Sequence, residues 1–142
     1  MALKKRMELL LNFSFALVYV LVLDLVFIGL VLRRFFGPMV SEIQGDELRL
    51  RWAPAIVCYV FIAFGLAYFA VGQVKDESPV VGSLQWGFVW GAVVYAIFDL
   101  TNLSMFSKYK YSVAGLDILW GGVLGFLVCL STKYTVMAIQ KK

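Results

Sequence analysis

The chain alternates between four long apolar stretches and short polar segments. The apolar stretches cover residues 8–32, 53–74, 80–106 and 112–137, and each is longer than the about 20 residues that cross a bilayer as a helix. Because lipid offers no hydrogen-bond partner to an unpaired backbone amide or carbonyl, an open sheet of four such strands is excluded. The pattern therefore predicts four transmembrane helices.

Three polar connections separate these helices. The first, residues 33–52, holds Gly37, Pro38 and Gly45 among many charges, which is typical of a solvated loop with room for a short interfacial helix. The second, around residues 75–79, and the third, residues 107–111, are short, so neighbouring helices are predicted to run antiparallel. The expected fold is all-α: one integral membrane domain over residues 1–142, a polytopic four-transmembrane-helix up-down bundle.

Composition agrees with a membrane location. The chain is 62% hydrophobic and 15% charged with a mean hydropathy of +0.86, whereas about a quarter of the residues of soluble domains are charged. The net charge of +4 is scattered over termini and loops, so it favours contact with lipid headgroups over nucleic acid. Lys4, Lys5 and Arg6 precede the first apolar run, but that run is too long for a cleaved signal peptide and ends at Arg33. The first run is therefore expected to be a retained span.

The orientation in the membrane is poorly determined. Seven lysines and arginines belong to the termini and the second connection, and six belong to the first and third connections. The cluster ahead of the first helix favours cytoplasmic termini, and the near balance also permits insertion both ways. We expect a multi-pass location in the cell membrane, plasma or inner.

Three aspartates lie inside the predicted spans. Asp24 comes nine residues before Arg33, Asp99 nine before Lys108, and Asp117 seven after Lys110. At 1.5 Å per residue, all three carboxyl groups lie roughly 10 to 14 Å from the same membrane face. Acidic groups in hydrocarbon are costly and usually serve a function. This common depth predicts a site.

Two of these aspartates continue stripes of small residues. The stripe on the third helix comprises Gly87, Gly91, Tyr95, Asp99 and Asn102. The stripe on the fourth helix comprises Asp117, Gly121 and Gly125, with Trp120 beside it. Glycines four residues apart allow close helix contact, so we predict that the two stripes pack together and bring Asp99 near Asp117.

Asp24 has only apolar neighbours on its own helix, so its partner must come from elsewhere. The candidates are Asn102, Thr101, Tyr95 or a bound cation. A group of aromatic residues near the span ends is expected to form an interfacial belt instead: Trp52, Trp86, Tyr68, Tyr109 and Tyr111. Cys58 and Cys129 are expected to be packing residues, because the chain has no histidine and no C-x-x-C spacing. No cofactor is predicted.

The run from Tyr95 through Asp99, Thr101 and Asn102 resembles the Y-x-x-Y-D-L-T-N signature of an uncharacterised family of bacterial four-helix membrane proteins, domain of unknown function 2177. The run from Asp117 to Trp120 and its following glycine is similar to that family's D-x-x-W-G signature, and the surroundings of Asp24 are also similar. The resemblance covers about residues 17–128. It departs at Phe98, where the family often has tyrosine, and at residues 26–27, where tryptophan is common.

The resemblance implies an architecture and a set of motif positions, and it implies no activity. The motif positions are Asp24, Asp99, Thr101, Asn102, Asp117 and Trp120. Together with Tyr95 they are the candidate ligand- or ion-binding residues, and Gly87, Gly91, Gly121 and Gly125 are the candidate packing residues.

Three functions are compatible with these residues. The first is a channel or carrier for protons, cations or a small cationic solute, in which four helices enclose so little space that a homo-oligomer is expected. The second is a structural or assembly subunit of a membrane complex, in which hydrogen-bonded aspartates hold helices together. The third is a lipid-directed enzyme with Mg²⁺ held by the aspartates and Asn102, although no nucleophile or general-base motif is present.

Overall fold

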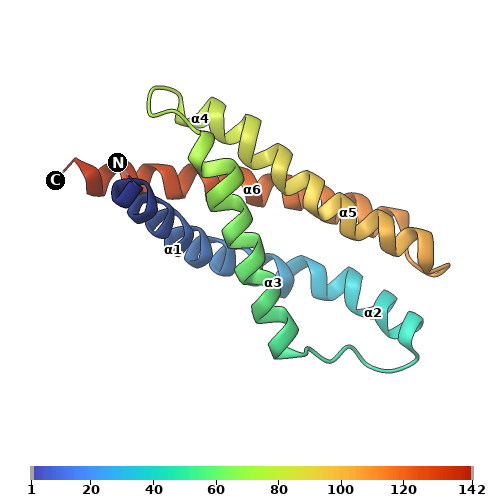
Figure 1. The fold of residues 1–142 in the computed structure, drawn as a ribbon. Helices are drawn as coiled ribbons and strands as arrows, with labels where there is room; N and C mark the ends of the chain where they lie inside the picture. The colour runs from blue at the N-terminus through green and yellow to red at the C-terminus, as the bar shows by residue number, and fades with distance from the viewer. Residues whose placement is uncertain (1, 142) are drawn as a thin grey trace.

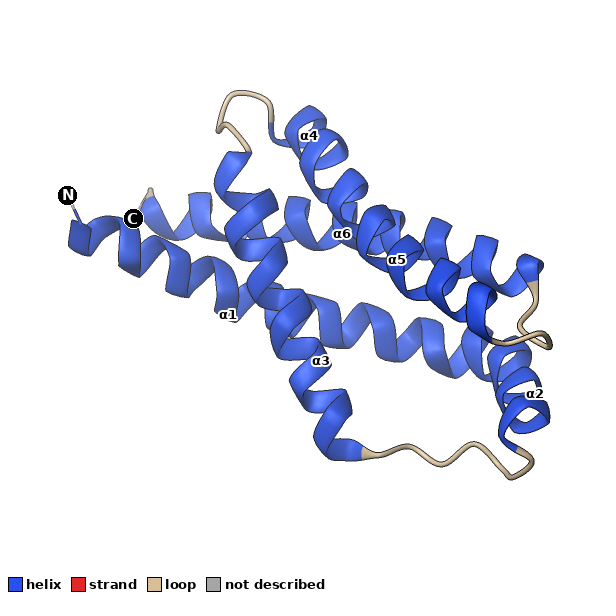
Figure 2. Ribbon diagram, turned by 45° about the vertical axis from the view of Figure 1, so that its right-hand side comes forward, coloured by secondary structure: helices blue, strands red, loops and turns tan. Residues whose placement is uncertain are grey.

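The computed structural model describes residues 2–141, and nearly all of them are helical (Figure 2). The α-helices are α1 (Ala2–Phe27), α2 (Arg33–Gln44), α3 (Trp52–Gly65), α4 (Pro79–Gly82), α5 (Val89–Met105) and α6 (Tyr111–Gln140). Wider π-helical turns continue them at Ile28–Leu32, Leu66–Ala70 and Ser83–Phe88, and a short 3₁₀ turn follows at Val71–Gln73.

Four of the resulting continuous helices are long and apolar enough to cross a membrane. They cover Leu3–Val31, Trp52–Gln73, Pro79–Met105 and Tyr111–Gln140. The all-helical, four-span prediction is confirmed. The first helix begins before the predicted boundary and the last ends after it, because the basic residues near both termini are good helix formers and do not stop a helix.

The helices alternate in direction, and α6 lies at the centre of the arrangement. α1 packs along α6 and continues into α2, and α5 lies beside α6 with the opposite direction (Figure 1). The two termini and the connection at residues 74–78 lie at one end, and the connections before α3 and after α5 lie towards the other (Figures 1 and 2). α3 runs obliquely across the others, so its first turns stand apart from the rest.

The first connection divides into a helix and a loop. The sequence leaves room for a short interfacial helix here, and the structure has the twelve-residue helix α2, which continues through Pro38, so that only residues 45–51 are irregular. Gly45 ends the helix with a positive φ of 73°, and its amide donates to the Ser41 carbonyl at 2.9 Å. Glycine is the residue best suited to this left-handed helix end.

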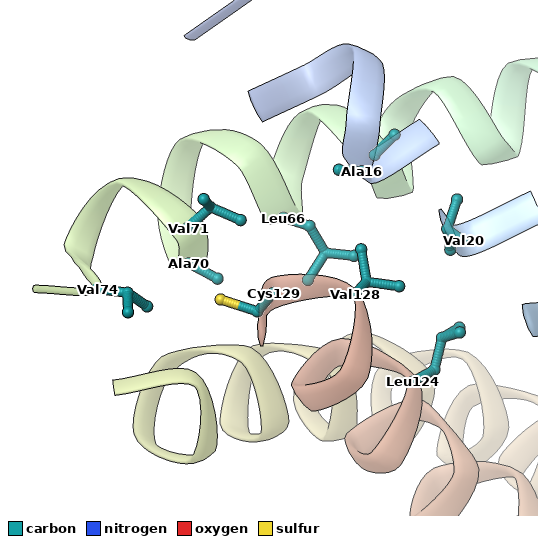
Figure 3. Packing of buried hydrophobic residues seen from close by; sticks show 10 residues of the cluster. Ala16, Val20, Leu66, Ala70, Val71, Val74, Leu124, Val128 and Cys129 are labelled. Carbon is teal, nitrogen blue, oxygen red and sulfur yellow. The ribbon is translucent and has the colours of Figure 1, made fainter. Parts of the chain in front are cut away.

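A main apolar core lies on the side of the bundle nearer the termini. Ala16 and Val20 of α1, Leu66 and Ala70 of the second span, and Val128 of α6 are all at most 1% exposed (Figure 3). Small residues alternate with larger ones in this cluster, which lets three helices approach one another closely. The core holds α1 and the second half of the second span against α6.

A second, smaller cluster lies at the opposite end and accounts for α2. Met39 is fully buried against Tyr109, Val113 and Ala114, and its sulfur accepts a hydrogen bond from the Lys110 amide at 3.2 Å. These contacts dock α2 onto the turn between α5 and α6. Burial of Met39 against the other helices stabilises α2 as a helix. This stabilisation comes from tertiary contacts, so the glycine- and proline-containing sequence of the segment does not predict it.

Candidate functional site

The site is built on the contact between α5 and α6, where glycine backbones meet. A methyl group at Gly87 would lie 2.5 Å from the Gly125 carbonyl oxygen and 2.7 Å from the Cys129 Cβ. A methyl group at Gly91 would overlap the Gly121 backbone. The two glycine stripes therefore pack directly against each other, as their spacing predicts.

This contact follows a regular antiparallel register that leads to the aspartates. Every step of four residues up one helix matches a step of four down the other, so Gly87 packs between Gly125 and Cys129, and Gly91 packs between Gly121 and Gly125. One step further, the Tyr95 ring covers Gly121, where it occupies the space of a side chain. The next step brings Asp99 opposite Asp117. The carboxyl group of Asp99 and that of Asp117 are close enough to interact directly.

Asp99 is fully buried and only half satisfied. The Tyr109 hydroxyl donates to one carboxyl oxygen, Oδ1, at 2.7 Å. The other oxygen, Oδ2, has no hydrogen-bond partner among the described residues. A buried carboxyl oxygen without a partner is costly, so Asp99 retains the capacity to accept a proton, a water molecule or a cation.

Asp117 lies between the other two aspartates. Its side chain is 6% exposed, and its carboxyl group is within electrostatic reach of both Asp99 and Asp24. Asp99 and Asp117 lie six residues from the nearer ends of their helices, Met105 and Tyr111. At 1.5 Å per residue, this places the acid pair about 9 Å inside one end of the bundle.

Asp24 has a different environment, because both of its oxygens are occupied. The Tyr59 hydroxyl donates to Oδ2 at 2.6 Å, and the Trp120 indole N–H donates to Oδ1 at 2.9 Å. Phe27 stacks on the Trp120 ring with a centroid distance of 4.2 Å and an interplanar angle of 5°. One carboxylate on α1 thus holds α3 and α6 together.

The partners of Asp24 differ from those predicted. Thr101 is exposed, and the Asn102 side chain donates to the Phe98 carbonyl oxygen of its own helix at 3.0 Å. Tyr95 lies within electrostatic reach of Asp24 and Asp117 but forms no hydrogen bond with Asp24 in the described structure. The prediction failed because the residues that lie opposite Asp24 depend on how each helix is rotated about its axis. The apolar neighbours of Asp24 in the sequence give no information on that rotation.

Tyr59 and Tyr109 were missed as members of the site. Tyr109 was expected in the interfacial belt, yet it is only 6% exposed and donates to Asp99. Burial, together with the hydrogen bond to Asp99, raises the pKa of the Tyr109 hydroxyl above its ordinary value, so it stays a donor. The sequence contains only a weak indication of either tyrosine. Tyr109 lies just beyond a span that carries an aspartate in its last turns, which is also where an interfacial tyrosine is expected, and Tyr59 lies in an apolar stretch with no polar pattern around it.

The remaining aromatic belt residues are exposed. Trp52 is 71% exposed, Tyr111 82%, Tyr68 53% and Trp86 42%. Such positions suit the lipid interface. Cys129 is fully buried in the main core, whereas Cys58 is exposed.

The fold and the buried acids define the class: a multi-pass membrane protein with four spans. The chain belongs to the predicted membrane protein family DUF2177, whose family model matches residues 9–134. The matched range includes both motif runs, and the resemblance drawn from them is confirmed. The chain matches no curated protein and no solved structure.

Proposed function

We propose that this protein is a small channel or carrier whose Asp99–Asp117 pair binds a proton or cation inside the membrane. The observation that carries the proposal is the unpartnered Oδ2 of Asp99, fully buried beside a second carboxyl group. Two neighbouring carboxylates repel strongly at low dielectric, so the pair is stable when one proton or one cation lies between them. Taking up and releasing that charge is the step transport requires.

The surroundings of the pair suit exchange with one membrane face. Tyr109 covers Asp99 from the turn after α5, only about 9 Å of helix away from that end, and its hydroxyl is a fixed donor. Towards the other end, the glycine contacts of α5 and α6 leave no room for even an added methyl group. Passage across the whole bilayer therefore requires helix movement or a route between subunits, and we propose a homo-oligomer.

Transport is tested in proteoliposomes loaded with a pH-sensitive dye, under imposed proton and potassium gradients. Wild-type protein is expected to give a flux above protein-free vesicles, and Asp99→Asn and Asp117→Asn each to reduce it at least tenfold, because an amide cannot exchange a proton or balance a cation. Asp46→Asn, in the exposed loop before α3, is the matched control and keeps the wild-type flux. No wild-type flux, or normal flux in both site variants, overturns the proposal.

A structural or assembly role is the second candidate, and Asp24 favours it. Both Asp24 oxygens are occupied by donors from α3 and α6, which is the arrangement of a helix clamp rather than of a site awaiting a ligand. In that case Asp24→Asn disturbs assembly on native gels, and fluxes are absent in wild type. No metal-dependent enzyme is proposed, because residues 2–141 contain no group of three or more His, Cys, Asp or Glu side chains placed to hold a metal ion.

A further inference from the structure

A second polar feature lies at the opposite end of the bundle from the acid pair. A cavity of about 520 Å³ opens between the first turns of α1 and the end of the second span. α1 contributes Lys5, Arg6 and Asn12 to its wall, and the second span contributes Tyr68 and Gln73. None of these residues belongs to the acid pair or to the Asp24 clamp.

The position of the cavity along α1 places its mouth among lipid headgroups. Arg6 and Arg33 are 27 residues apart on one continuous helix, a distance of about 40 Å at 1.5 Å per residue. A bilayer including its headgroups is about 40–45 Å thick. A bilayer that this helix crosses along its normal has the two arginines at its two headgroup levels, and the cavity then begins at the level of Arg6.

Its walls change from charged at the mouth to apolar and amide-bearing deeper in. Asn12 lies about 9 Å further along α1 than Arg6 and is only 5% exposed, while its helix neighbour Leu9 and the buried Ala67 supply apolar wall. Among the side-chain hydrogen bonds within residues 2–141, none involves the Asn12 amide. This amide lines the cavity, where it can hydrogen-bond a ligand.

The charges at the mouth favour one kind of ligand. Lys5 and Arg6 carry two positive charges and Glu8, on the same rim, carries one negative charge, which leaves a net charge of +1. A phosphodiester, with one negative charge, neutralises this set, and arginine and lysine are the usual phosphate donors. A lipid placed with its phosphate at Lys5 and Arg6 has its glycerol esters near Asn12 and its acyl chains against the apolar wall.

We propose that this cavity binds a phospholipid through the phosphodiester of its headgroup. The site is independent of the proposed transport function, since it lies at the other end of the molecule and uses other residues. A bound lipid ties the start of α1 to the end of the second span, at the face where both termini lie.

The test uses the purified full-length protein in a neutral detergent, with bound lipid counted by native mass spectrometry. Phosphatidylglycerol is compared with diacylglycerol, which keeps the chains and lacks the phosphate, and with inorganic phosphate, which lacks the chains. The site variant is Lys5→Gln with Arg6→Gln. The matched control is Lys4→Gln with Lys75→Gln, which removes two charges from the same face outside the cavity.

Wild type and the control are expected to bind phosphatidylglycerol alike, and the site variant to bind it about 10- to 30-fold more weakly, because two headgroup contacts are lost. Asn12→Leu weakens binding too and leaves the rim charges in place. Equal losses in the site variant and the control overturn the proposal, since they indicate unspecific attraction. Diacylglycerol binding as tightly as phosphatidylglycerol also overturns it, and inorganic phosphate binding as tightly as the lipid assigns the cavity to a soluble phosphate instead.

Discussion

The indole nitrogen of Trp120 donates a 2.9 Å hydrogen bond to the carboxylate of Asp24, although 96 residues separate them in the sequence. The Tyr59 hydroxyl completes the arrangement at 2.6 Å, so three helices meet at one acidic side chain. The neighbouring Asp99 faces Asp117, and Oδ2 of Asp99 has no hydrogen-bond partner in the described part of the chain. The aspartates therefore differ in their hydrogen bonding: both oxygens of Asp24 accept donors from other helices, whereas Oδ2 of Asp99 has no partner within residues 2–141.

Replacing Tyr59 by phenylalanine is expected to destabilise the protein by about 1–3 kcal/mol, because a hydrogen bond to a carboxylate is lost and Asp24 remains buried. Thermal unfolding in detergent micelles, followed by circular dichroism, measures the change as a Tm lower by several degrees. Tyr68→Phe is the matched control, since Tyr68 is 53% exposed on the same span. An equal Tm for the two variants contradicts the clamp.

Replacing Gly91 by alanine is expected to separate α5 from α6, because the new methyl group overlaps backbone rather than a movable side chain. Overpacking of this kind costs about 1–3 kcal/mol or more. Gly115→Ala, also in a span helix, meets no atom within 4 Å and is expected to leave stability unchanged or raise it slightly. Thermal unfolding of both variants tests the register, and wild-type stability of Gly91→Ala contradicts it.

Tyr109 is expected to ionise above the ordinary tyrosine pKa of about 10, because burial and then its bond to Asp99 favour the neutral hydroxyl. Since the folded pKa lies above the unfolded one, this hydroxyl stabilises the fold below about pH 10 and its contribution declines as the pH rises further. Tyrosinate absorbance during alkaline titration measures this: Tyr109→Phe removes amplitude from the late part of the curve. Tyr111→Phe, at a site 82% exposed, leaves the Tyr109 amplitude in place. If Tyr109→Phe instead removes absorbance from the early part of the titration, near the ordinary tyrosine pKa, the Tyr109 hydroxyl is not buried.

Replacing Met39 by alanine is expected to release α2 from the end of the bundle, because a fully buried side chain leaves a cavity worth about 2–5 kcal/mol. Hydrogen exchange of residues 33–44 is the measurement, and it should become much faster. Met105→Ala, at a position 62% exposed, is the size-matched control. Lys108→Gln removes the exposed 3.8 Å pair with the Glu42 carboxylate and the exposed 3.2 Å hydrogen bond from the Lys108 ammonium to the Glu42 carbonyl oxygen. It is expected to change exchange little, since exposed pairs of this kind contribute about 0–1 kcal/mol. If residues 33–44 exchange faster in Lys108→Gln than in Met39→Ala, the contacts of Lys108 rather than the burial of Met39 hold α2 in place.

The features predicted correctly from the sequence are those that depend on spacing along one helix. Apolar length identifies the spans, and the four-residue repeat that joins Gly87 and Gly91 to Asp99 identifies one face of a helix. The same repeat from Asp117 to Gly125 identifies the face opposite it. Because both stripes are narrow and backbone contact requires glycine, their pairing could be inferred without coordinates.

The sequence by itself determined the four spans, the placement of three aspartates within them and the pairing of the glycine stripes, since each follows from apolar length or from the fixed rise and turn of a helix. Only the tertiary structure decided that Tyr59 and Trp120 satisfy Asp24, that Tyr109 is buried over Asp99, and that Met39 holds α2 as a helix. These contacts depend on how each helix is rotated and tilted against its neighbours. That rotation and tilt are set by the packing of the whole bundle and leave no periodic signal in any one segment.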